Sequence, residues 1–211
     1  MYNYSYSTSP WYSNTSKVKS VIIGNSVTSI GSYAFYDCTN LASVYYTGDI
    51  AGWCKIKFDS FYSNPVYYAN NLYIDGALVE GDIVIPDGVT AIRNYTFTNC
   101  DGITSVTIPN SVTSIGYQAF FGCSSLASIT IPESVEIISP NMFLKCTALK
   151  EVTIPKSVTD IGLRAFYGCR VTVDKDNTAY SNDEIGALFN KDKTTLVEMI
   201  EKEIREKTLN F

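Results

Sequence analysis

A strict 23-residue period runs through the second half of this 211-residue chain and constrains its fold more than any other feature. Cysteine recurs at Cys100, Cys123, Cys146 and Cys169. Four further columns keep the same period: Phe97, Phe120, Phe143 and Phe166; Ile92, Ile115, Ile138 and Ile161; Val89, Val112, Val135 and Val158; Pro86, Pro109, Pro132 and Pro155. Because a unit of 23 residues cannot bury its own apolar face, the units must stack, and their stacking predicts a solenoid.

Each repeat contains one strand and one turn. Leu126, Ile129 and Ile131 have the LxxLxL spacing of a leucine-rich repeat. Thr130 alternates with the two isoleucines, which predicts a strand with Thr130 on its outer face. A short turn or helix over residues 119–123 would place one large apolar side chain inside. We therefore expect a right-handed α/β solenoid, a leucine-rich-repeat superhelix with a parallel concave sheet of six or seven strands.

An insertion at about residues 47–81 interrupts the period. Cys38 of an earlier copy lies 62 residues before Cys100, which is not a multiple of 23. Within this insertion the sequence GDIAGWC favours a short helical turn. Asp75 and Gly76 stand between apolar pairs, a pattern typical of a two-residue β-hairpin loop.

Both ends of the chain depart from the repeat. Residues 1–17 are interpreted as the remnant of an upstream module, residues 18–173 as the solenoid, and residues 174–211 as a C-terminal loop and capping helix. A last repeat strand is expected at Val171–Val173 and a further strand or turn at Ala187–Asn190.

The final helix is predicted from its own side chains. Thr195 and Glu198 have the spacing of a capping box. Leu196, Ile200 and Ile204 lie on one face of a helix. Because the end of a solenoid exposes apolar side chains, we expect this helix to cover the last repeat.

Composition narrows the classes of function. The chain has no histidine, which removes Ser–His and Cys–His nucleophile pairs and histidine-based metal sites. Its net charge of −5 argues against a nucleic-acid partner. No apolar run approaches the roughly 18 residues that span a bilayer, so we expect no membrane insertion in this segment. We assign no catalytic residue, no metal ligand and no cofactor.

Two groups of residues resemble metal or redox sites. The cysteine column is consistent with buried free thiols, disulfide bridges or a metal site. We favour free thiols, because stacked side chains point in parallel and not toward each other. Asp174, Asp176 and Asn177 suggest a calcium loop, but Ala179 and Ile185 stand where an EF-hand needs glycine and glutamate. We favour an ordinary polar turn there.

The repeats resemble a known family. The segments SVTSIGSYAFYDCTNLASV and SVTIPNSVTSIGYQAFFGCSSLASITIP are similar to the BspA-like leucine-rich repeats of bacterial and protozoan surface proteins. The resemblance covers roughly residues 11–196. It implies a secreted or surface-attached protein, since several members are implicated in adhesion to host matrix proteins or to other cells. An extracellular or cell-surface location is the expectation that follows.

Two surfaces are candidates for partner binding. The first is the outer face of the strands, which we expect to be concave: Tyr45, Val84, Ser105, Thr107, Ser128, Thr130, Glu151 and Thr153. The second is the tyrosine-rich insertion: Tyr62, Tyr67, Tyr68 and Tyr73. The alternatives are a merely solvated sheet face, where threonine suits strands, and tyrosines that cover the core.

The sequence favours a non-catalytic protein-interaction module. The expected partner is a host extracellular-matrix protein or a cell-surface protein, bound by a fragment of an adhesin. A carbohydrate- or cell-wall-binding module is the alternative, because the chain has 16 tyrosines. An enzyme ranks third, because paired carboxylates in a cleft would be needed and the repeats place Asp and Glu irregularly.

Overall fold

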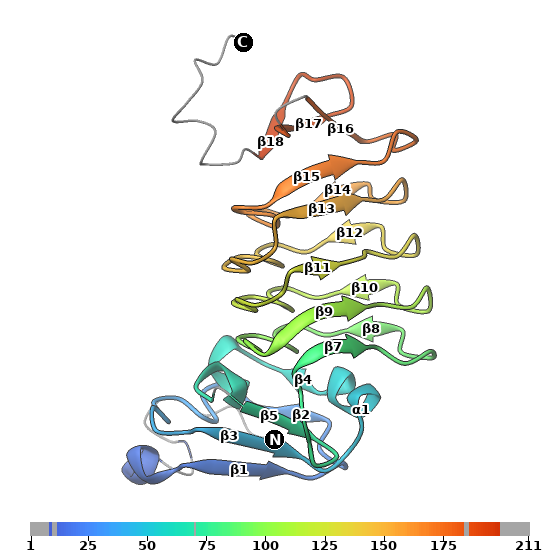
Figure 1. The fold of residues 1–211 in the computed structure, drawn as a ribbon. Helices are drawn as coiled ribbons and strands as arrows, with labels where there is room; N and C mark the ends of the chain where they lie inside the picture. Colours follow the sequence, from blue (N-terminus) through green and yellow to red (C-terminus); the bar gives the residue numbers. More distant parts are fainter. Residues whose placement is uncertain (1–8, 10–11, 70, 184–185, 199–211) are drawn as a thin grey trace.

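The chain folds into a parallel-strand β-solenoid of about seven turns with about 23 residues per turn (Figure 1). A computed structural model describes residues 9, 12–69, 71–183 and 186–198. Its elements are η1 (Tyr12–Lys17), β1 (Ser20–Ile23), β2 (Ser29–Ile30), β3 (Ser43–Tyr46), α1 (Ile50–Lys55), β4 (Lys57–Phe58), η2 (Phe61–Ser63), η3 (Pro65–Tyr67), β5 (Asn71–Ile74), β6 (Ala77–Leu78), β7 (Gly81–Val84), β8 (Ala91–Ile92), β9 (Ile103–Thr107), β10 (Ser114–Ile115), β11 (Ser128–Ile129), β12 (Ile137–Ile138), β13 (Glu151–Ile154), β14 (Asp160–Ile161), β15 (Arg170–Val173), β16 (Tyr180–Asn182), β17 (Leu188–Asn190) and β18 (Leu196–Glu198).

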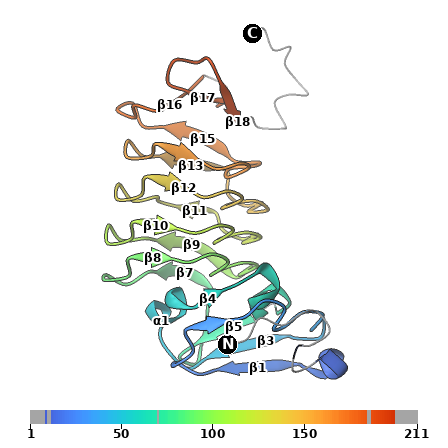
Figure 2. The same ribbon diagram turned by 180° about the vertical axis from the view of Figure 1, so that it is seen from behind.

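Two rows of parallel strands run along different sides of the solenoid (Figures 1 and 2). The front row contains β1, β3, β5, β7, β9, β11, β13 and β15, and the back row contains β2, β4, β8, β10, β12 and β14. Equivalent residues of successive repeats pair directly, as Ser105 does with Ser128 in the front row. The period of the sequence therefore becomes columns of like side chains along the solenoid.

The interior column of phenylalanines confirms the predicted stacking. Phe97, Phe120, Phe143 and Phe166 are all buried. Their ring centroids follow one another at 5.5, 6.0 and 5.8 Å with interplanar angles of 11° to 24°. Each ring thus fills the space above the ring of the repeat before, which gives one continuous core.

In the regular repeats the turn after each back-row strand, from β8 to β14, is compact and irregular, not helical. Gln118 and Gly122 bracket this turn in one repeat, with φ of 52° and 74°. At Gly122 a Cβ atom would overlap the side-chain oxygen of Asn99 in the preceding repeat. Glycine suits this position because the backbone is left-handed and the two repeats approach closely, although Asn99 and Lys145 hold the same position in other repeats at φ of 57° and 68°.

The six cysteines are free and buried, as the ladder interpretation predicts. The Cys123 thiol donates to the carbonyl oxygen of Phe97, and the Cys146 thiol donates to that of Phe120, each at 3.0 Å. Within the described ranges no group of three or more Cys, Asp or Glu side chains is arranged to hold a metal ion. The thiols satisfy carbonyl groups of the neighbouring repeat, which accounts for a polar atom in an apolar column.

We expect thiol titration to find few reactive groups in the native protein and six after denaturation. Burial raises the pKa of Cys54 to about 12, and burial with the neighbouring Cys169 raises the pKa of Cys146 to about 12. The folded pKa of each of these thiols exceeds the ordinary value of 9.0, so the protonated, buried thiol favours the folded state. This contribution to stability is complete below about pH 9 and is lost as the pH rises toward 12. Rapid labelling of several thiols at pH 8 in the folded state would contradict the buried ladder.

The predicted insertion contributes a strand to the front row. β5 pairs in parallel with β3 along four residues, so the described part of the chain has eight front-row strands instead of the expected six or seven. The hairpin prediction is confirmed: Asp75 and Gly76 have φ of 49° and 79° and join β5 to the antiparallel β6. The predicted helical turn is α1, whose buried Trp53 donates its indole N–H to the Thr96 carbonyl at 2.9 Å.

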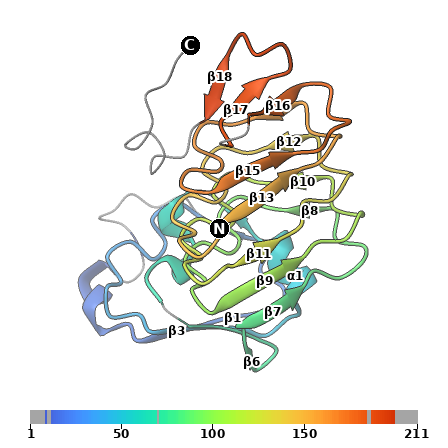
Figure 3. The same cartoon turned by 45° about the horizontal axis from the view of Figure 1, so that its top comes forward.

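The predicted C-terminal helix is wrong where the structure describes it. Residues 196–198 form β18, and the capping box from Thr195 to Glu198 does not occur. β18 pairs antiparallel with β17, which pairs with β16, at the C-terminal end of the solenoid (Figure 3). Strand pairing satisfies the backbone and brings Val197 against the core, which outweighs the weak local ion pairs that favoured a helix. Ile200 and Ile204 lie outside the described residues.

Candidate functional site

The outer face of the front row carries two columns of side chains. In the first column, Thr107, Thr130 and Thr153 are all exposed. The residue at the start of this column, Val84, pairs with Thr107 and is 63% exposed. These side chains lie on one face as the alternation in the sequence predicts, and threonine makes most of that face polar.

Side chains in and beside the second column form hydrogen bonds with one another. The hydroxyl of Ser105 donates to the Asp82 carboxylate at 2.7 Å, and the hydroxyl of Thr104 donates to the same oxygen at 3.1 Å. These two hydrogen bonds lower the pKa of Asp82. Further along the face Ser128 is exposed, and Glu151 accepts a hydrogen bond from the hydroxyl of Thr172.

The two carboxylates of this column are poorly placed for joint acid–base chemistry. Asp82 and Glu151 lie three repeats apart along the front row, which is roughly 14 Å at the usual strand spacing. Paired carboxylates in glycosidases are about 5 to 9.5 Å apart. Asp82 and Glu151 are therefore too far apart to act together as such a pair.

An apolar strip crosses the N-terminal end of the front row. It consists of Ile22, Tyr45, Tyr73 and Leu78, which pair in register across β1, β3, β5 and β6. Ile22 is 73% exposed and Tyr45 is 39% exposed. The rings of Tyr45 and Tyr73 stack with centroids 4.7 Å apart and planes 15° apart. Contiguous exposed apolar side chains of this kind are typical of interaction sites.

The strip joins residues that the sequence assigned to two separate surfaces. Tyr45 was placed on the strand face and Tyr73 in the insertion, but β5 brings them together. Leu78 was missed. The signal that could have found it is the Asp75-Gly76 hairpin, because a two-residue loop fixes which residue of the second strand faces Tyr73.

The other three tyrosines predicted for partner binding pack against other aromatic side chains. Tyr62, Tyr67 and Tyr68 are half-buried in an aromatic cluster. The further members of this cluster are Tyr33, Tyr36, Phe61, Tyr95, Tyr117 and Phe121. The Tyr68 hydroxyl accepts a hydrogen bond from the Asp37 N–H at 3.1 Å, and burial raises the pKa of Tyr68 to about 12. The cluster ties early repeats to later ones, largely through edge-to-face contacts.

A hollow of about 810 Å³ lies over the back row, and its lining includes none of the residues predicted for partner binding. Its lining comes from β4, β8, β10 and β12 and the residues beside them. No pattern in the sequence predicts this hollow, because it depends on small side chains that meet in register across strands. The positions of glycine and alanine in the sequence do not by themselves show which small residues lie side by side on neighbouring strands.

The residues considered for calcium form a polar turn, as favoured. Asn177 is buried, and its side-chain amide donates to the carbonyl groups of Pro155 and Val158 at 2.8 and 3.0 Å. Its side-chain oxygen accepts from the N–H groups of Ala179 and Tyr180, both at 2.8 Å. With its hydrogen-bonding capacity used in this way, Asn177 fastens the C-terminal strands to the last repeats.

No helix in the described part of the chain is long and apolar enough to cross a bilayer.

Comparison with known families accounts for the period and the fold together. A family model for the BspA type leucine-rich repeat region matches residues 6–72 and 79–194 in six copies. The chain belongs to the BspA-type leucine-rich-repeat family. BspA-type repeats are generally structural or interaction modules and not enzymes.

Solved structures of bacterial leucine-rich-repeat proteins resemble parts of this BspA-type chain. A protein from Bacteroides ovatus is 31% identical, with 75% of this chain and 38% of that chain covered and a TM-score of 0.45. A protein from Eubacterium ventriosum is 22% identical, with 94% and 43% covered and a TM-score of 0.46. The pneumococcal vaccine antigen PcpA is 21% identical, with 86% and 36% covered and a TM-score of 0.47. The chain thus spans less than half the length of each, and no curated protein matches it.

Proposed function

We propose that this protein is an interaction module that binds another protein through the apolar strip of Ile22, Tyr45, Tyr73 and Leu78. The observation that carries the proposal is that these side chains pair in register on four strands, with Ile22 and Tyr45 exposed and Tyr73 and Leu78 partly exposed. Tyrosine is enriched at protein interfaces because its large ring loses little conformational entropy on binding. Val84 of β7, in the same row of strands, is also apolar and exposed.

A protein partner suits this strip better than a glycan. Sugar-binding sites need exposed aromatic faces, whereas the stacked rings of Tyr45 and Tyr73 turn a face toward each other. The remaining tyrosines of the insertion contact one another in the aromatic cluster. A carbohydrate- or cell-wall-binding role therefore remains the second candidate, with 16 tyrosines in the chain as its support.

The wider setting of the proposal is an adhesin at the cell surface or outside the cell. Family membership supports it, because BspA-type repeats suggest surface proteins. The partner would be a host extracellular-matrix protein or a protein of a neighbouring cell. The polar threonine column beyond the strip would then form the rim of the interface, where polar contacts surround an apolar centre.

Replacing Tyr45 and Tyr73 together by serine should weaken binding of a protein partner at least about tenfold, because buried tyrosines are frequent interface hot spots worth about 2 kcal/mol or more. Surface plasmon resonance against purified extracellular-matrix and cell-surface proteins would measure the change, with a glycan array run in parallel. Both side chains lie on the surface, so the fold should persist.

The matched control replaces Thr107 and Thr130 by serine in the same two-strand arrangement. This pair removes two exposed methyl groups outside the strip and should leave binding within about twofold, as for peripheral contacts. Partner binding that the tyrosine variant leaves unchanged would refute the strip as the docking site. A glycan signal that the tyrosine variant abolishes would favour the carbohydrate role.

A further inference from the structure

The hollow over the back row lies on a different surface from the apolar strip and has its own chemistry. Its volume of about 810 Å³ falls within the range of ligand sites, about 300 to 1,000 Å³. It extends across β4, β8, β10 and β12. Whatever it binds is therefore independent of the function proposed for the front row.

Small side chains and a break in strand pairing create this hollow. Ala91, Ser114 and Gly116 are among its lining residues. A Cβ atom at Gly116 would overlap the backbone of Asn94, so the close stacking of two repeats keeps this position bare. Among the described residues β4 pairs with β2 and β8 pairs with β10, but β4 and β8 do not pair with each other. The depression is thus built by the backbone and does not depend on a side-chain rotamer.

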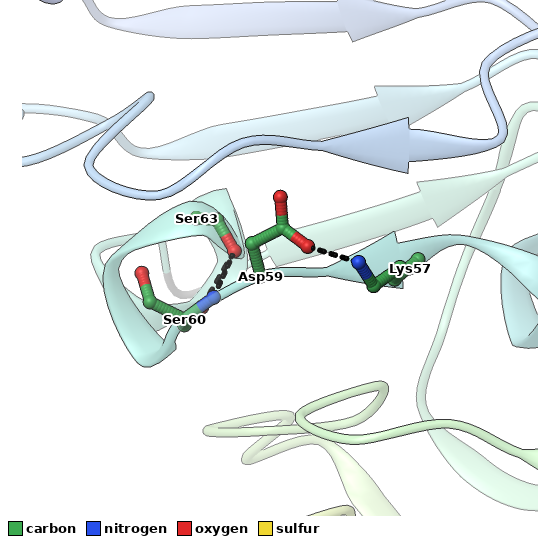
Figure 4. Close-up of polar contacts among 4 residues, drawn as sticks. All are labelled: Lys57, Asp59, Ser60 and Ser63. Carbon is green, nitrogen blue, oxygen red and sulfur yellow. Dashed lines mark hydrogen bonds and ion pairs between the residues drawn. The ribbon is translucent and has the colours of Figure 1, made fainter. Parts of the chain in front are cut away.

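Charged groups of opposite sign lie at two places in the lining. Arg93 follows β8, and Glu136 precedes β12. Lys57 and Asp59 also line the hollow, but they neutralise each other in an ion pair of 2.7 Å (Figure 4). Neither Arg93 nor Glu136 forms an ion pair with another residue that the structure describes.

The separation of Arg93 and Glu136 follows from the register. Ile92, Ile115 and Ile138 are paired neighbours, so the two charged residues lie two strands apart across the row. Arg93 and Glu136 also differ by three residue positions along the strand direction. The offset across the strands and the offset along them are each about 10 Å, which gives a diagonal of roughly 14 Å between the two backbones. Four residues of extended chain span about 13 to 14 Å, and residues i and i+4 of such a chain point to the same side.

We propose that the hollow binds an extended peptide segment with an acidic and a basic side chain four residues apart. The acidic side chain pairs with Arg93 and the basic one with Glu136. The middle residue of the segment faces the same way and contacts Ile137, an isoleucine that is 56% exposed in the lining. A neutral glycan would leave both charges unpaired, whereas a peptide of this pattern matches the charges and the apolar contact.

Fluorescence anisotropy with three labelled peptides tests the pairing. The first is acetyl-Asp-Thr-Val-Thr-Lys-amide, and the other two carry lysine or aspartate at both ends. The native chain should prefer the mixed peptide by about two- to fivefold, the range of exposed ion pairs. Arg93→Glu should shift the preference to the peptide with two lysines. Glu136→Lys should shift it to the peptide with two aspartates.

Lys156→Glu provides the matched control for Arg93→Glu, because it makes the same charge change at an exposed residue outside the lining. It should leave the order of the three peptides unchanged. An equal shift in the control would show attraction to net charge alone and would overturn the site. Equal binding of all three peptides to the native chain, or no binding, would overturn it as well. The tyrosine variant of the strip should bind the mixed peptide normally, so failure here is distinct from failure of the proposed function.

Discussion

Phe120→Ala should lower the free energy of unfolding by about 3 to 5 kcal/mol, the usual cost of truncating a large core aromatic. Phe120 is fully buried between Phe97 and Phe143, at centroid distances of 5.5 and 6.0 Å. The change removes contacts with both neighbouring repeats at once and leaves a cavity at their junction. Urea denaturation followed by circular dichroism would measure the loss.

Thr130→Ala is the matched control, because Thr130 belongs to an adjacent segment of the repeat but is exposed on the front row. A substitution at an exposed site should change the free energy of unfolding by less than about 0.5 kcal/mol. If both variants unfolded at the same urea concentration, the assignment of inside and outside in the repeat would be wrong.

Asn177→Ala should be the second large effect, with a loss of about 3 kcal/mol or more. The substitution removes four hydrogen bonds and leaves two carbonyl and two N–H groups without their partner in a buried place. Each buried polar group that loses its partner costs about 1 to 3 kcal/mol, although entering water would recover part of it. Thermal unfolding and limited proteolysis at the C-terminal end would detect the loosened strands.

Asp176→Ala separates this role from the general polarity of the turn. Asp176 is the exposed neighbour of Asn177, and the hydrogen bond it makes in this turn uses its backbone N–H and the Asp174 carboxylate. Its truncation should therefore cost less than about 0.5 kcal/mol. Equal destabilisation by the two variants would mean that Asn177 does not hold the C-terminal strands in place.

The sequence alone was sufficient for the solenoid and its core. A strict period places identical residues at equivalent points of every turn, so Phe120 must meet Phe97 and Phe143 if the units stack at all. The alternation around Thr130 likewise settles which side chains face outward. The hairpin at Asp75 and Gly76 was predictable because its chemistry is local.

Tertiary structure alone decided the features that depend on pairing between distant segments. β5 joins β3 across 28 residues of sequence and brings Tyr73 beside Tyr45, which no local pattern specifies. At the other end, Leu196 lies in a segment whose side-chain spacing favours a helix, yet pairing with β17 makes Leu196 part of a strand. The free energy of sheet pairing and burial exceeds the few tenths of a kcal/mol by which helical ion pairs favour their own conformation. The hollow over the back row has the same origin, because it forms where small residues such as Gly116 lie in register with the neighbouring repeats, next to the break in strand pairing between β4 and β8.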